Sequence, residues 1–146
     1  MGSRNVGLHR KGEISIQDLI EQIGSHERFR EVGAIASFFG IVRGTSQDGK
    51  SVTGLDMEAY EDKAEKVFSS IAEDMKKRPG IVEVFIHHVT GHLKVGDLIF
   101  VVVVAGSNRK HVFPTLTETV EKIKEEATIW KKETLSTGES YWVEYT

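Results

Sequence analysis

The sequence predicts an α+β fold in which helices pack on one side of a mainly antiparallel sheet. Segments with apolar residues at helical spacing alternate with β-rich segments, in the order helix, two strands, helix, two strands, helix, hairpin. The run LIFVVVVA at residues 98–105 is apolar at every position, so we expect it to lie centrally in the sheet. No repeat or linker interrupts the 146 residues, and we expect a single domain over residues 13–146.

The first half of the chain is expected to form one helix and one β-hairpin after a flexible N-terminal arm, residues 1–12. Ser15 has an acidic residue three positions later, which suits the N-cap of the first helix. The small and β-branched residues of GAIASFFGIVRG (33–44) predict a strand, and Gly40 within it indicates a bulge or a close backbone approach. SVTGLDMEAY (51–60) alternates imperfectly and predicts the second strand of the hairpin.

The second half is expected to alternate helices with pairs of strands. Apolar residues at helical spacing predict helices over residues 61–78 and 109–127. Between them, IVEVFIHHV (81–89) and the run at 98–105 predict two strands, and the tail predicts two short strands around residues 136–140.

The composition limits the class of protein and of partner. Hydrophobic residues make up 39% and charged residues 28% of the chain, as in ordinary soluble globular domains. Lys and Arg number 19 against 22 Asp and Glu, so general nucleic-acid binding is not indicated and an anionic partner must be met by a few local cations. No cysteine is present, which excludes disulfides, thiolate metal sites and cysteine nucleophiles. The polar N-terminus and the shortness of the longest apolar run lead us to expect a cytoplasmic protein.

Two lysines late in the chain, Lys124 and Lys131, admit two interpretations. On a continuous helix their spacing would put them about 20° from the same direction, at the edge of the inward face, although the helix is expected to end between them. The ordinary interpretation is a pair of solvated lysines that bind Glu121, Glu125 or Glu126. The alternative is an anion pocket.

Further cations stand at the ends of predicted elements. Asn108 and Arg109 open the last helix, where free backbone N–H groups and an arginine favour an anion, while Ser107 before them suits an ordinary N-cap. Arg43 closes the first predicted strand. A pocket shared by these cations and the two lysines is the prediction that follows.

Other familiar chemistries have no visible apparatus in the sequence. His87 and His88 are adjacent on a predicted strand and therefore face opposite sides, and no carboxylate completes a set with His92, so we predict no metal site. There is no P-loop, dinucleotide fingerprint or Gly-x-Ser-x-Gly elbow. We expect no cofactor.

Five segments together carry a resemblance to a known family. In chain order they read GAIASFFGIVRG, LDMEAYEDKAEK, HHVTGHLKVGD, AGSNRKHVF and KIKEEATIWKKE, with a closing YWVE. In these segments the chain resembles the large, catalytic subunit of molybdopterin synthase, the MoaE family, from about residue 33 to residue 144. The most specific segment is the last, which contains both lysines.

The resemblance implies a fold, an activity and partners. The fold would be α+β with an α/β-hammerhead portion. The activity would be a sulfurtransferase step of molybdenum cofactor biosynthesis, in which cyclic pyranopterin monophosphate becomes molybdopterin. The sulfur would come from the thiocarboxylated C-terminus of a ubiquitin-like small subunit, MoaD, and two large subunits would pair as a homodimer within a heterotetramer. A sulfur-transfer enzyme without cysteine is coherent because the partner carries the sulfur.

The resemblance also implies the site residues. Lys124 and Lys131 match the two catalytic lysines of the family. The substrate-contacting positions match Ile41, Val42, Arg43, Asn108, Arg109, Lys124, Lys131, Lys132 and Glu133. The chain departs from the family at Asn108, where the family has a histidine, so an imidazole that could transfer a proton is missing there. The alternative is therefore a non-catalytic scaffold that binds pterin or MoaD, and a regulatory domain for a phosphate ligand is a third, more remote hypothesis.

Overall fold

A computed structural model describes residues 5–143 of the chain and confirms the predicted α+β class. Its helices and strands are β1 (Val6–Arg10), α1 (Ile16–Gly24), β2 (Ala34–Ile41), β3 (Val52–Ala59), α2 (Glu61–Lys76), β4 (Ile81–Lys94), β5 (Leu98–Gly106), α3 (Arg109–Glu126), β6 (Ile129–Leu135) and β7 (Ser140–Val143), with a short 3-10 turn at Phe29–Glu31. Among the described residues, no helix has the length and apolar character needed to cross a membrane.

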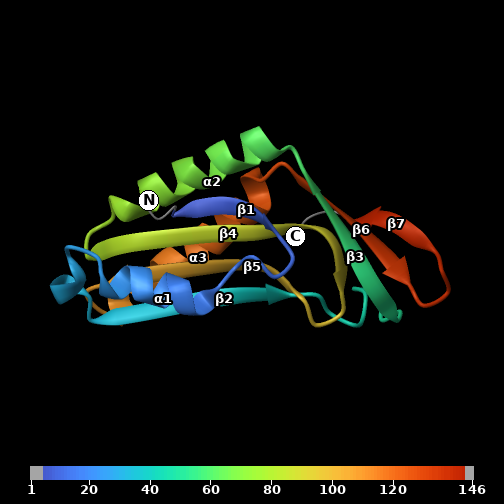
Figure 1. Cartoon of the computed structure of the whole chain (residues 1–146), viewed down its shortest axis with the longest axis horizontal. Coiled ribbons are helices and arrows are strands. Elements are labelled where there is room, and N and C mark those ends of the chain that lie inside the picture. Colours follow the sequence, from blue (N-terminus) through green and yellow to red (C-terminus); the bar gives the residue numbers. More distant parts are fainter. Residues whose placement is uncertain (1–4, 144–146) are drawn as a thin grey trace.

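The strands form one sheet in the order β2-β5-β4-β3-β6-β7, and β1 pairs with β4. All pairs are antiparallel except β1 with β4. Strand β4 is long enough to pair with β5 along its first part and with β3 at Gly91–Lys94, and Gly91 takes a positive φ of 100° where the partner changes. Figure 1 shows the result, with β3, β6 and β7 grouped at one end of the molecule.

Two predictions about the first half of the chain are wrong. The proposed flexible arm contains β1, which lies parallel to β4 and is held by a hydrogen bond from Asn5 Nδ2 to Glu83 Oε1 (2.6 Å). Residues 1–4 of that arm lie outside the described part of the chain. The predicted hairpin of β2 and β3 does not form, because β2 pairs with β5 while β3 pairs with β4 and β6. Alternation of side chains identifies a strand but not its partner.

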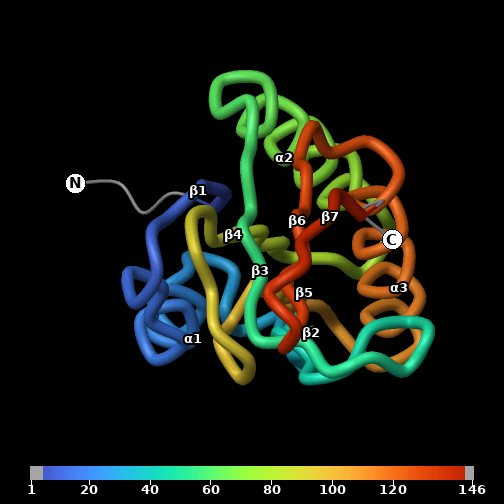
Figure 2. The backbone as a smooth tube through the Cα atoms, turned by 90° about the vertical axis from the view of Figure 1, so that its right-hand side faces the viewer, coloured from blue at the N-terminus to red at the C-terminus, as the bar shows by residue number. Residues whose placement is uncertain are grey.

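Strand β5 lies between β2 and β4, as predicted for the fully apolar run, and its two faces serve two cores. Phe100, Val102 and Val104 pack with α2 and α3, whereas the alternate residues Val101 and Val103 pack with α1. The helices therefore cover both faces of the sheet, and the expectation that they lie on one side is wrong; Figure 2 shows α1 and α3 on opposite sides of the strands.

Helix ends follow their local chemistry. Ser15 Oγ accepts a hydrogen bond from the backbone N–H of Asp18 (3.2 Å), as predicted for the N-cap of α1. At α3 the N-cap is Asn108 rather than Ser107: its Oδ1 accepts from the N–H of Lys110 at 2.9 Å. The long third helix then runs from this cap to the region of the lysines.

Candidate active site

A pocket of about 610 Å³ opens where four parts of the chain meet. These are the end of β2, the loop over residues 45–48, the last turn of α3 and the β6–β7 pair, and Phe100 of β5 also lines it. Of the predicted site residues, the pocket brings together Ile41, Arg43, Lys124, Lys131 and Glu133.

The two lysines reach the pocket from different elements. Lys124 stands in the last turn of α3, and Lys131 stands on β6, since the helix ends at Glu126, between them, as expected. Both are partly buried. The ordinary interpretation of solvated ion pairs holds for their neighbour Lys122, whose Nζ lies 3.8 Å from Glu126 Oε2. Lys124 and Lys131 differ from Lys122 in that both line the pocket.

Burial and neighbouring positive charges lower the pKa of both amines. Burial, followed by the charge of Lys131 and against the opposing effect of Glu121, lowers the pKa of Lys124 from 10.5 to about 8. Burial also lowers the pKa of Lys131, where Glu133 opposes the shift and Arg43 adds to it. The pocket therefore holds one amine that loses its proton close to neutral pH.

Arg43 follows the end of β2, where the chain leaves the sheet. Its Nε donates a hydrogen bond to the carbonyl of Thr45 (2.9 Å), which fixes the side chain beside the loop that borders the pocket. The preceding residue, Val42, is buried in the core and anchors this turn through a hydrogen bond from its N–H to the carbonyl of Asp97 (2.9 Å). Val42 thus positions the site from behind, while the exposed side chain of Ile41 lines it.

An acidic wall lies beside the cations. Glu133 shares the lining with Lys131, two residues earlier on β6, and its Oε1 accepts a hydrogen bond from Tyr141 Oη (2.7 Å) on the paired strand β7. Asp48 of the loop also lines the pocket, and a hydrogen bond from Ser46 lowers the pKa of its carboxyl group. The site can therefore meet an anion with one wall and hydrogen-bond donors of a ligand with the other.

Sequence reasoning missed the aromatic floor of the pocket. Phe100 was expected only as part of a central strand, yet its ring lies 5.1 Å from Lys124 Nζ, within cation–π range. Phe38 of β2 also lines the pocket and lies 5.3 Å from the Phe100 ring, between centroids. No signal in an all-apolar run marks one of its residues as part of a site.

Three predicted site residues lie elsewhere within the chain. Lys132 alternates with Lys131 on β6 and is absent from the lining; its Nζ lies 5.8 Å from the centroid of the Trp142 ring. Asn108 and Arg109 stand at the opposite end of α3 from Lys124, which at 1.5 Å per residue is roughly 22 Å along the helix axis. Within one chain, the pocket therefore holds Arg43, Lys124 and Lys131 but not Arg109.

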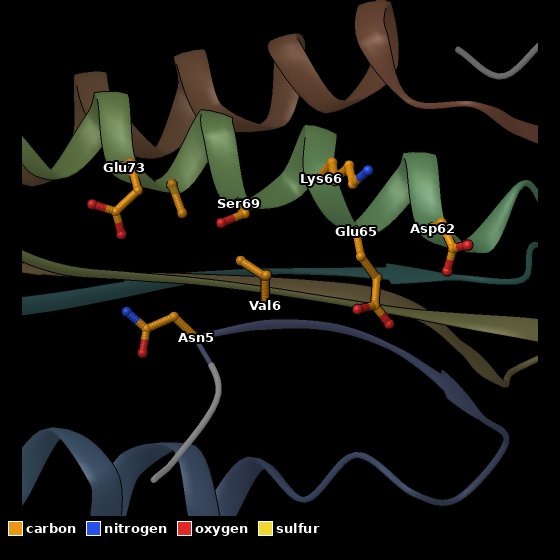
Figure 3. Close-up of a pocket in the computed structure, with 8 residues that line it drawn as sticks. Asn5, Val6, Asp62, Glu65, Lys66, Ser69 and Glu73 are labelled. Atoms are coloured by element: carbon orange, nitrogen blue, oxygen red, sulfur yellow. The ribbon is translucent and has the colours of Figure 1, made fainter.

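A second hollow of about 590 Å³ lies between β1 and α2 and differs in charge. Figure 3 shows Asp62, Glu65 and Glu73 projecting from α2 toward β1, and among the described residues that line this hollow Lys66 is the one cation. Such a surface repels anions. The pocket of the two lysines is therefore the better candidate for an anionic ligand.

Comparisons with known proteins agree on one family. The family model described as MoaE protein matches residues 9–126. A probable molybdopterin synthase of Haloferax volcanii is 36% identical over 132 residues, which are 89% of this chain and 50% of that protein, so the chain spans half of that relative's length. The molybdopterin synthase catalytic subunit of Pyrococcus abyssi is 32% identical over 145 residues, 99% of this chain and 94% of that protein. The crystal structure of molybdopterin synthase from Staphylococcus aureus superposes with a TM-score of 0.83 at 29% identity, over 97% of this chain and 98% of that one.

Proposed function

The chain belongs to the MoaE family, and from that premise we propose that it is the catalytic large subunit of molybdopterin synthase. It converts cyclic pyranopterin monophosphate to molybdopterin with sulfur from a thiocarboxylated MoaD-type small subunit. The observation that carries the proposal is the convergence of Lys124, Lys131 and Arg43 on one partly buried pocket.

Substrate binding rests on the local cations. The substrate carries a phosphate, and the chain as a whole carries a net charge of -3, so attraction must come from the pocket itself. Arg43 offers a planar fork of donors suited to phosphate, and Lys131 adds a positive charge from the facing strand. Asp48 and Glu133 on the acidic wall accept hydrogen bonds from N–H groups of the pterin.

Lys124 is the residue proposed to act on the reacting atoms. An amine must be neutral to accept a proton or attack a carbon, and a pKa of about 8 leaves a substantial neutral fraction at neutral pH. Burial lowers the pKa of Lys131 against the opposing effect of Glu133. In its protonated form, Lys131 stabilises the negative charge of the thiocarboxylate or of the opening phosphate ring.

The sulfur has to come from a partner. The chain contains no cysteine that could carry it, and the pocket lies open at the surface beside β7, where an extended tail can enter. A thiocarboxylate at the end of a flexible C-terminus meets this requirement. The small subunit is therefore part of the proposed function.

A second copy of the chain accounts for Asn108 and Arg109. They stand a helix length from the pocket of their own chain, so if they contact substrate they do so in the pocket of a neighbouring copy. This supports the homodimer within a heterotetramer. Asn108 can donate and accept hydrogen bonds there but cannot transfer a proton by titration.

The test is reconstitution of the reaction. Purified protein, a thiocarboxylated MoaD-type subunit and the cyclic pterin precursor are mixed, and molybdopterin is measured by mass spectrometry. We expect product with the wild-type chain and with Lys122→Ala, whose side chain is paired with Glu126 on the same helix, and none with Lys124→Ala. Binding of the small subunit without product would instead favour a scaffold that has lost activity because Asn108 stands where the family has a histidine. Asn108→His would then be expected to restore turnover.

A further inference from the structure

Three residues stand side by side across three neighbouring strands, and the ring of the central one lies beneath Lys124. Phe100 of β5 pairs in register with Gly40 of β2 on one side and with His88 of β4 on the other. Phe100 and His88 are almost fully buried, and both belong to the face of the sheet covered by α2 and α3. Lys124 projects from α3 over the Phe100 ring in the middle of this row.

The row forms a stack of flat rings. The rings of Phe100 and His88 are stacked at 5.5 Å between centroids and 10° between planes. His88 is stacked in turn with Phe68 of α2 at 6.1 Å and 16°. At the other end, Lys124 Nζ lies 5.1 Å from the centroid of the Phe100 ring. The side chains of Lys124, Phe100, His88 and Phe68, from α3, β5, β4 and α2, thus contact one another in that order.

Gly40 makes room for this stack. A Cβ at Gly40 would lie 2.7 Å from two carbons of the Phe100 ring, a separation that real Cβ atoms essentially never show. The ring therefore lies over the bare backbone of β2, at the point where the register of β2 and β5 shifts. The prediction of a bulge or a close approach at Gly40 is confirmed, and the absence of a Cβ there admits the ring on which Lys124 lies.

We propose that Gly40, Phe100 and His88 are positioning residues for Lys124, with the Phe100 ring as its platform and the His88 ring as the support that holds the platform flat. The inference deepens the proposed function, on which it rests, by naming what holds the reacting amine in place. Phe100 and His88 act through Lys124 rather than on substrate.

His88 suits this role because it stays neutral. Its Nδ1 lies 2.8 Å from the carbonyl of Val89, so it donates to that oxygen and the ring is fixed. Burial, opposed by that hydrogen bond and reinforced by the charge of Lys124, lowers the pKa of His88 to about 4. The support therefore adds no second positive charge below the lysine at neutral pH.

The other charged groups around Lys124 come from several elements. Glu121 precedes it by one turn on α3, and Lys131 and Glu133 face it from β6. Arg43 and Asp48 line the same pocket from the segment after β2. None of these belongs to the stack, so substitutions in the stack change the position of the amine while leaving the surrounding charges in place.

The test compares two adjacent histidines on opposite faces of β4. His88→Leu removes the flat support, His88→Phe restores it without an imidazole, and His87→Leu is the matched control, since His87 packs against His9 on the other face. Titration of each lysine is measured in the full chain by peptide-resolved labelling with an amine-reactive anhydride across pH 6–11. The kcat and KM of the reconstituted reaction are measured in parallel.

With His88→Leu we expect the titration midpoint of Lys124 to rise by about one pH unit toward that of an ordinary lysine, with kcat about tenfold lower and KM within about twofold. His88→Phe and His87→Leu should match the wild type in both measurements. If His88→Leu does not fold, Gly40→Ala displaces the same ring from β2 and should reproduce its effects.

Three results would overturn the inference. One is an unchanged Lys124 midpoint and kcat in His88→Leu. Another is loss of rate in His88→Leu without any change in the Lys124 midpoint. The last is loss of rate in His88→Phe with a normal midpoint, which would mean that the imidazole itself reacts. Absence of molybdopterin with the wild-type chain would refute the proposed function alone, because the labelling experiment still reports on the positioning of Lys124.

Discussion

Replacing Lys124 by arginine separates the two things a lysine can supply, a positive charge and a neutral amine. With a pKa of about 8, roughly one Lys124 in ten is neutral at pH 7, whereas an ordinary lysine at 10.5 is neutral about once in three thousand. Arginine keeps the charge but is effectively never neutral. If the neutral amine reacts, Lys124→Arg should lower kcat at pH 7 by at least about 100-fold. Lys131→Arg, which preserves the charge that Lys131 is proposed to supply, should lower kcat by less than about tenfold.

The assay is the initial rate of molybdopterin formation in the reconstituted reaction from pH 6 to pH 9. The wild-type kcat should rise about tenfold from pH 6 to pH 7 and about fivefold from pH 7 to pH 8, and then level off, as neutral Lys124 accumulates. Lys122→Arg, an exchange on the same helix at a residue paired with Glu126, should match the wild type. A Lys124→Arg variant that keeps more than a tenth of the wild-type rate at pH 7 would contradict the role of a neutral amine, since a permanent cation would then suffice.

Three further outcomes are expected. Lys124→Met should increase the free energy of unfolding at pH 7, because the pKa of Lys124 is lower in the folded chain than in the unfolded one; the full shift corresponds to about 3 kcal/mol, and partial exposure reduces it to about 1 kcal/mol. Between pH 8 and pH 10.5 the folded amine loses its proton before the unfolded one, so the stability of the wild type rises with pH. The gain from Lys124→Met should therefore disappear over this range in urea titrations. Arg43→Lys keeps the charge but loses the fork and the hydrogen bond to Thr45, so KM for the pterin should rise about tenfold with kcat within about threefold; a change confined to kcat would contradict a binding role. Asn5→Ala leaves the buried carboxylate of Glu83 without its donor from β1, so thermal unfolding should show a loss of about 1–2 kcal/mol with normal kcat, and unchanged stability would mean that this bond does not hold β1.

The parts of the fold that could be predicted are those that local sequence determines. The cap at Ser15, the bulge at Gly40 and the central position of β5 each follow from a few neighbouring residues. Strand partners do not, because the residues that pair with β3 stand 34 to 83 positions away. The short strand β1 has no apolar run and is stabilised by contacts such as Asn5 with Glu83, which no local pattern announces.

The site was predictable to a similar extent. Recognition of the segment around Lys124 and Lys131 identified the residues that meet in the pocket, although the spacing alone left ordinary ion pairs as the simpler interpretation. It could not separate Lys131 from Lys132, because the two are neighbours on a strand, the first of the two expected in the tail, and their side chains alternate there. Nor could it find Phe100, because the role of that ring depends on its contacts with residues of β4 and α3, which are distant in the sequence or in another element.

The change of partner along β4 has a consequence for the active site. Lys124 belongs to α3, which packs on the portion of the sheet formed by β2, β5 and the first part of β4, whereas Lys131 belongs to the portion formed by β3, β6 and β7. Among the described strands, β4 is the one that pairs with both portions, and it bends at Gly91. The separation of the two amines is thus governed by the shape of a strand that contributes neither of them. A side chain at position 91 would strain the backbone at a φ of 100°. The resulting change in the shape of β4 would alter the distance between Lys124 and Lys131, although position 91 contacts neither lysine.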